Sequence, residues 1–135
     1  MFYEVTSKRT VMDNKGMDKL VSEKFIIENI EFFAEAENKM YEFYNNENQV
    51  TAIKQSTLKE FVNKRSNDEQ VIFFATIESI FVDELTGDDK ATKYVVGLFA
   101  KSIDEAYVVT NEYLKQGMED LVLVGIKKTK VVELI

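Results

Sequence analysis

The sequence contains no cysteine, no histidine, no proline and no tryptophan. Without cysteine, the chain can form neither disulfide bonds nor a thiolate nucleophile. Without histidine, it lacks the side chain that most often transfers protons near neutral pH and most often binds metals. Carboxylates are numerous, with 24 Asp and Glu residues, but no spacing selects a pair for acid–base catalysis. We therefore expect a protein that is not an enzyme and that holds no metal or other cofactor.

Long apolar runs and clustered glycines are also missing. No apolar run reaches the roughly 18 residues that a membrane-spanning helix needs, and Met1–Glu4 does not resemble the start of a secretion signal. The five glycines are scattered along the chain, so none forms a phosphate-binding loop. These features predict a cytoplasmic protein without a membrane partner.

The residues that are present describe an ordinary globular chain. Of the 135 residues, 45% are hydrophobic, and ten Phe and six Tyr can supply a core, so we expect one domain spanning residues 1–135. The chain carries 17 basic and 24 acidic residues, for a net charge of −7. The acidic excess is spread over both halves, which argues against a dedicated polyanion-binding tail.

The chain repeats one pattern of strand, strand, helix and strand. The first half predicts strands over residues 2–11, 20–27 and 50–58 and a helix over residues 33–44. The second half predicts strands over residues 71–82, 92–98 and 121–126, the last extended by residues 127–135, and a helix that begins after Ser102. Three pairs of positions keep the two halves in register, at offsets of 71, 70 and 73 residues: Gly16 with Gly87, Ala36 with Ala106, and Ile53 with Ile126.

This repetition predicts an α+β fold in two layers, with internally duplicated β-β-α-β units related by a pseudo-twofold axis. The first unit covers residues 2–62, residues 63–69 form a linker, and the second unit covers residues 70–135. We expect the weakly apolar first strand at a sheet edge and the strand over residues 71–82, apolar on both faces, near the centre. The residues expected to be buried by the two helices are Ala36, Met40 and Phe43, and Ala106, Val109 and Tyr113.

Several short motifs resemble a known family. They are the strand Val21–Ile27, the helix start Phe33–Glu37, the segment Val50–Lys54 and, in the second half, residues around Ser102–Ala106. The chain is similar in these motifs to an uncharacterised family, a domain of unknown function of gut anaerobic bacteria and their bacteriophages. The resemblance implies a microbial protein, or a phage protein in the cytoplasm of its bacterial host. It supplies no catalytic residues.

Two sets of residues are candidates for binding. The first helix carries more aromatic residues than a single buried face can hold. Tyr41 and Tyr44 are therefore candidate contacts for a partner, which would be either a second copy in a homodimer or another protein. The second set consists of lysines on predicted strands, which could contact the phosphates of a single-stranded nucleic acid or could protect sheet edges against aggregation. These lysines are Lys54, Lys127, Lys128 and Lys130.

One acidic turn, Asp83–Asp89, resembles a cation-binding loop in composition, but Leu85 occupies a position where a calcium loop needs an oxygen ligand. We read it as a solvated hairpin turn. The sequence thus favours a non-catalytic microbial or phage module that acts through protein–protein contacts. The alternatives are a single-stranded nucleic-acid-binding protein and a protein that sequesters a small ligand at the junction of the two repeats.

Overall fold

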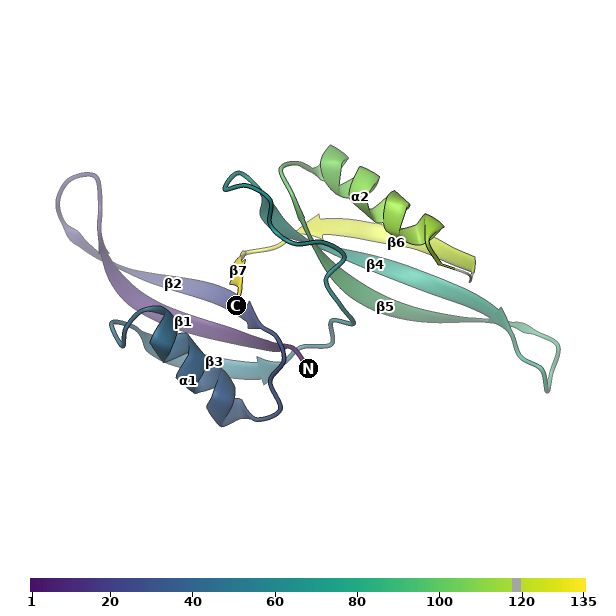
Figure 1. The fold of residues 1–135 in the computed structure, drawn as a ribbon, viewed down its shortest axis with the longest axis horizontal. Coiled ribbons are helices and arrows are strands. Elements are labelled where there is room, and N and C mark those ends of the chain that lie inside the picture. The colour runs from purple at the N-terminus through teal and green to yellow at the C-terminus, as the bar shows by residue number, and fades with distance from the viewer. Residues whose placement is uncertain (118–119) are drawn as a thin grey trace. The chain divides into compact units, whose positions relative to one another are not determined.

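The fold is α+β, as the sequence predicts. The computed structural model describes residues 1–117 and 120–135 and contains, within them, seven strands and two helices (Figure 1). The chain divides into two compact units. Unit 1 comprises Met1–Ser56 and Lys130–Ile135, and unit 2 comprises Thr57–Thr129. Each unit consists of one sheet with one helix against one of its faces.

Unit 1 contains a four-stranded sheet in the order β3-β1-β2-β7. Helix α1 connects β2 to β3 and packs against β1 and β3. Strand β7 runs parallel to β2, whereas the other neighbours are antiparallel. The elements are β1 (Tyr3–Met12), β2 (Asp18–Ile27), α1 (Phe33–Phe43), β3 (Gln49–Gln55) and β7 (Val131–Leu134).

Strand β1 lies inside the sheet, so the expectation of an edge strand is wrong. It pairs with β2 along its whole length and with β3 from Tyr3 to Lys8. Polar and apolar residues alternate along β1 because a helix covers only one face of the sheet. This alternation shows which residues point to each face, but it does not show whether the strand has a neighbour on one side or on both. On the uncovered face Glu4 Oε1 lies 3.5 Å from Lys24 Nζ and 3.7 Å from Lys54 Nζ.

Unit 2 contains a three-stranded antiparallel sheet in the order β5-β4-β6. Its elements are β4 (Val71–Val82), β5 (Asp89–Ala100), α2 (Ile103–Lys115) and β6 (Asp120–Lys128). The central position of β4 confirms the expectation from its two apolar faces. Strand β6 has an apolar run, Leu121–Val124, of the kind typical of a buried strand. It nevertheless lies at the sheet edge and leaves Val122 and Val124 about half exposed (48% and 49%).

The first three strands of each unit have the same connectivity. The first strand is central, the second lies on one side, and the strand after the helix lies on the other. The hairpin turns use Gly16 and Gly87, with φ of 76° and 72°, and α1 is followed by Asn45 and Asn46, which also have positive φ. Ser102 Oγ accepts the Glu105 amide at 3.2 Å and caps α2. The common connectivity supports an internal duplication, which stays a prediction together with the pseudo-twofold relation.

In each unit, a segment from the other half of the sequence pairs with the outer edge of the second strand. In unit 2, residues 59–62 run alongside β5, where the Val62 amide donates to the Gly97 carbonyl at 2.9 Å. In unit 1, β7 runs alongside β2, and the Ile135 amide donates to the Ile26 carbonyl at 2.8 Å. Ile135 follows Val62 by 73 residues and Gly97 follows Ile26 by 71, the offsets that relate the repeated sequence motifs.

Residues 127–135 therefore do not simply extend the strand before them. Strand β6 ends at Lys128, and Thr129 donates both its amide and its hydroxyl to the Ile72 carbonyl, at 3.1 and 2.8 Å. The chain then enters unit 1 as β7. The break falls within the polar stretch Lys127–Lys130, but this stretch does not show that the following residues pair in the other unit.

Residues 63–69, the expected linker, lie within unit 2. The Asn63 side chain pairs with the backbone of Phe99 in both directions, accepting from its amide at 2.7 Å and donating to its carbonyl at 2.9 Å. Arg65 donates to the Gln70 carbonyl and lies over the Phe99 ring. Polar side chains thus attach this segment to β5, although it carries no apolar residue.

Each unit has its own apolar core. Ala36, Met40 and Ala106 are fully buried, as expected from their helical spacing. Phe43 is 45% exposed, because it sits in the last turn of α1 and only partly covers Phe25. In α2, Val109 and Tyr113 are partly buried, and the residue buried beside Ala106 is Thr110, whose hydroxyl donates to the Ala106 carbonyl at 2.7 Å.

Gly97 provides a test of the segment that pairs with β5. A Cβ atom at this position would lie 2.7 Å from the Phe61 ring, so we expect Gly97→Ala to lower the free energy of unfolding by about 1–3 kcal/mol in urea denaturation. Gly125→Ala is the matched control, because a Cβ atom there has no neighbour within 4 Å. Equal stability of the two variants would contradict the placement of Phe61.

Hydrogen exchange tests the pairing at the end of the chain. Terminal residues usually exchange their amide protons quickly, but we expect the Ile135 amide to be protected because it donates to Ile26 within the sheet. The Val62 amide should be protected in the same way. Exchange of Ile135 at the rate of a free chain end, measured by NMR, would show that β7 does not pair stably with β2.

Candidate interaction surfaces

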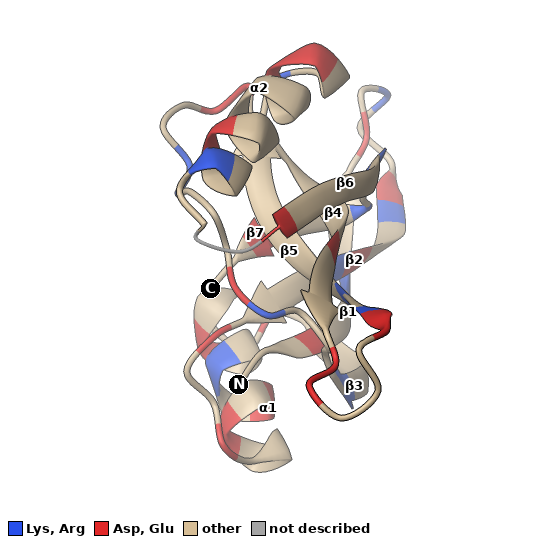
Figure 2. Ribbon diagram, turned by 90° about the vertical axis from the view of Figure 1, so that its right-hand side faces the viewer, with Lys and Arg blue, Asp and Glu red and all other residues tan. Residues whose placement is uncertain are grey.

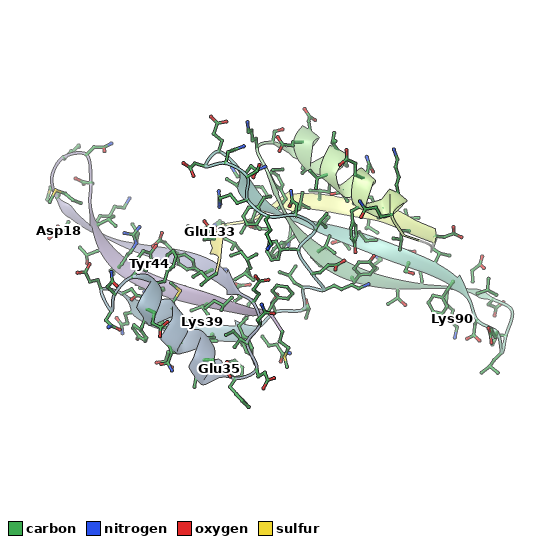
Figure 3. The ribbon with its side chains drawn as sticks, in the orientation of Figure 1. Asp18, Glu35, Lys39, Tyr44, Lys90 and Glu133 are labelled. Atoms are coloured by element: carbon green, nitrogen blue, oxygen red, sulfur yellow. The ribbon has the colours of Figure 1, made fainter. Side chains whose placement is uncertain are left out.

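Tyr44, predicted as a partner contact, belongs to a polar cluster on the helix-covered face of unit 1 (Figure 3). Its hydroxyl donates to Glu23 Oε1 at 2.9 Å. The Arg9 guanidinium forms two hydrogen bonds with the Glu23 carboxylate, at 2.6 and 3.4 Å, and lies 4.5 Å above the Tyr44 ring. One side chain from each of β1, β2 and the end of α1 thus fixes the helix end on the sheet.

This cluster changes the acidity of its members. Burial raises the pKa of the Tyr44 phenol, and the hydrogen bond to Glu23 raises it further, while Arg9 partly offsets both effects. The hydrogen bond to Glu23 raises the pKa of Arg9. Tyr44 therefore stays a neutral hydrogen-bond donor, and its main contacts lie inside unit 1.

Tyr41 is also occupied within unit 1. Its hydroxyl oxygen accepts the Val50 amide at 3.3 Å, at the start of β3, and its side chain is half-buried. Both tyrosines therefore connect α1 to the strands. Their role toward a partner stays a prediction.

The four candidate lysines do not gather within one unit. Lys54 lies on β3 and Lys130 immediately precedes β7, so they occupy opposite edges of the sheet in unit 1. Lys127 and Lys128 lie on β6 in unit 2, where consecutive residues point to opposite faces. Lys54 forms an ion pair with Glu4, which reduces the positive charge at that edge.

Unit 1 contains two open cavities. One, of about 310 Å³, is lined by Lys39, Glu42, Phe43 and Ile135. The other, of about 270 Å³, lies between two segments, Lys8–Thr10 and Asn46–Gln49, with Leu20 beside them. Ligand sites are mostly apolar with a few converging polar groups, whereas the first lining is half charged and the second is mostly charged or polar. Neither cavity by itself indicates a class of small ligand.

Exposed apolar side chains lie at several places, including Phe32 and Phe33 at the start of α1 (64% and 52% exposed) and the two hairpins that connect β1 to β2 and β4 to β5. Strands β1 and β2 continue as a two-stranded ribbon beyond Lys8, where the pairing of β1 with β3 ends. In unit 2, β4 pairs with the described part of β6 as far as Ile80, which lies two residues before the end of β4. Asp18 and Lys90 mark the hairpin ends of β2 and β5 (Figure 3). The exposed apolar residues are Met12, Met17 and Leu20 in the first hairpin and Phe81, Val82 and Leu85 in the second.

The sequence analysis did not select these residues. Their signal was an apolar residue close to a turn glycine in each half, as with Met17 after Gly16 and Leu85 before Gly87. Leu85 is 96% exposed, and Met12 is 71% exposed. Burial of such side chains against a partner would be favourable by about 25 cal/mol per Å² of apolar surface.

The turn Asp83–Asp89 is a hairpin turn, as expected. Asp83 Oδ1 accepts the Leu85 amide at 2.8 Å, and Asp83 Oδ2 lies 2.6 Å from Lys90 Nζ, whose hydrogen bond lowers the pKa of the Asp83 carboxyl. Throughout the described residues, no group of three or more Asp or Glu side chains is arranged to hold a metal ion. No helix in the described ranges is long and apolar enough to cross a membrane.

Replacement of Tyr44 tests the polar cluster. We expect Tyr44→Phe to lower the free energy of unfolding at neutral pH by about 1 kcal/mol, because the hydrogen bond to the Glu23 carboxylate is lost. The folded-state pKa of Tyr44 is raised, so its stabilising effect is present below the unfolded-state value near 10 and falls as the pH rises above it. The variant should therefore lose less stability than the wild type above about pH 10.

Denaturation across the alkaline range measures this difference. The variant should still lose some stability at alkaline pH, because burial and the hydrogen bond to Glu60 also raise the pKa of Tyr113. Tyr107→Phe, on the exposed side of α2, is the control. If the stability of Tyr44→Phe depends on pH in the same way as that of the wild type, the raised pKa of Tyr44 is contradicted.

Comparison with family models gives one match, which extends over residues 1–135 and bears the description domain of unknown function (DUF4494). Comparison with curated proteins and with solved structures gives no significant match. The family match covers every element of both units, including β7 and the segment that pairs with β5. The chain therefore belongs to the DUF4494 family, an uncharacterised family of domains of unknown function.

Proposed function

We propose that this protein is a non-catalytic module that acts through protein–protein contacts. The observation that supports the proposal is the strong exposure of apolar side chains at the two hairpin ends, with Leu85 at 96% and Met12 at 71% exposure. Exposed apolar groups rimmed by charged residues are typical of protein-binding sites. The absence of histidine and cysteine from the sequence agrees with a role that needs no proton transfer or nucleophile.

The proposal extends to origin and place of action. The motifs at Phe33–Glu37 and Val50–Lys54 resemble those of proteins from gut anaerobes and their bacteriophages. We therefore propose a microbial or phage protein that meets its partner in the bacterial cytoplasm.

Site-specific photo-crosslinking tests the protein-binding role. A photoreactive amino acid replaces Leu85 in one variant and Met12 in another, in cells that naturally encode the chain. Lys115, exposed on α2, is replaced in the control variant. Discrete protein adducts at the hairpin positions, with none at position 115, are expected, and equal labelling of all three positions would contradict a hairpin contact.

A second measurement separates this function from nucleic-acid binding. Purified protein is titrated with a labelled single-stranded oligonucleotide at low and high salt, since phosphate contacts give a steep salt dependence. We expect no binding. Salt-sensitive binding that Lys128→Glu abolishes would overturn the protein-binding proposal.

A further inference from the structure

The two hairpin ends occupy equivalent positions in the two units but carry opposite charge. The basic tip, defined as residues 8–20, has four basic and two acidic residues and a net charge of +2. The acidic tip, defined as residues 79–91, has one basic and four acidic residues and a net charge of −3. The two stretches are related by the 71-residue offset that also relates Gly16 to Gly87.

Most of this charge is available to a partner. In the basic tip, Lys8, Lys15 and Lys19 are exposed and form no ion pair with the described residues. Two charged groups of this tip already have roles within unit 1, since Arg9 binds Glu23 and Asp13 Oδ1 accepts the Lys15 and Met17 amides.

The acidic tip has the same division of roles. Asp83 is occupied by Lys90 and by the turn backbone. Glu84, Asp88 and Asp89 are exposed, and their carboxylates have no ion-pair partner in the described part of the chain. Three free cationic side chains on the basic tip, which also exposes Asp18, therefore correspond to three free anionic side chains on the acidic tip.

Apolar side chains accompany the charges on both tips. Met12, Met17 and Leu20 are exposed on the basic tip, and Phe81, Val82 and Leu85 are exposed on the acidic tip. Apolar anchors inside a charged rim supply affinity, while complementary charges around them select the partner and accelerate the encounter. Methionine is suited to such a contact because its flexible side chain adapts to the opposing surface.

We propose that the basic tip of one copy of this chain docks on the acidic tip of a second copy. Each chain carries both halves of the contact, so copies can join basic tip to acidic tip, either in a closed assembly or head to tail. Like tips repel each other, which excludes pairing of two basic or two acidic tips. A chain of net charge −7 tends to repel its own copies, and a local attraction of this kind opposes that repulsion. The inference rests on the proposed protein-binding function and names its partner.

Sedimentation of the full chain at two ionic strengths tests the inference. Between about 0.01 M and about 1 M salt the Debye length falls from about 30 Å to about 3 Å. We expect self-association at low salt, with a dissociation constant that rises by about tenfold or more at high salt. Lys39→Glu, on the exposed side of α1, is the control for total charge and should change the association little.

Charge exchange between variants gives the decisive result. Lys15→Glu/Lys19→Glu makes both tips acidic, and Asp88→Lys/Asp89→Lys makes both tips basic. Each variant alone should be monomeric under conditions in which the wild type associates, and an equimolar mixture of the two should associate again. Far-UV circular dichroism verifies that both variants are folded.

Three outcomes would overturn the inference: no self-association of the wild type at any salt concentration, self-association that the charge reversals do not affect, or no recovery in the mixture. These outcomes are distinguishable from failure of the proposed function. If the hairpin positions crosslink to a different protein while the purified chain stays monomeric, protein binding stands and the second-copy partner is wrong.

Discussion

The pairing of β2 and β5 with segments from the opposite half of the sequence is the constraint on which the rest of the fold depends. A strand at a sheet edge exposes unpaired amides and carbonyls, and these groups invite association with other chains. In unit 1, β7 covers the end of β2 through the bonds of Ile135 to Ile26 and Glu28. In unit 2, residues 59–62 cover β5, and the Asn63 side chain extends the pairing to Phe99. Each unit therefore includes a paired segment from the opposite half of the sequence: β7 in unit 1 and residues 59–62 in unit 2.

This arrangement has consequences for folding. The hairpins β1–β2 and β4–β5 are local and can form early, whereas the pairing of Lys24 with Val131 joins residues from distant parts of the chain. Contacts between distant residues carry a large loop-closure cost before they contribute stability, so they slow folding. Until β7 is in place, the outer edge of β2 stays open to pairing with other chains.

Much of the fold can be predicted from the sequence because its signals are local. The turn glycines, the Ser102 cap and the helical spacing of Ala36 and Met40 each depend on neighbouring residues, and the structure confirms them. The errors concern information that is not local. The alternation in β1 shows its two faces but not that it has a neighbour on each side. The apolar residues that begin at Val131 do not reveal that β7 joins the other unit.

The candidate site shows the same limit. The sequence singles out Tyr44 as a candidate partner contact, but only the structure shows that Glu23 accepts from its hydroxyl and that Arg9 lies over its ring. The exposed apolar residues at the hairpin ends were harder to recognise, because an apolar residue such as Leu85 in a strand-rich segment is normally assigned to the core. Their exposure becomes evident only when the extent of each strand pairing is known.

Comparison of the two units separates structural from functional residues. Positions that serve the shared scaffold keep their chemistry, as with Gly16 and Gly87 at the turns and Ala36 and Ala106 under the helices. The hairpin ends share the turn geometry and the exposed apolar character, yet one is basic and the other acidic. Solubility alone would be served by either sign of charge at both ends. Acidic residues lie on both helices as well (Figure 2). Opposite charge on otherwise equivalent hairpins is instead the arrangement expected where two different surfaces must recognise each other.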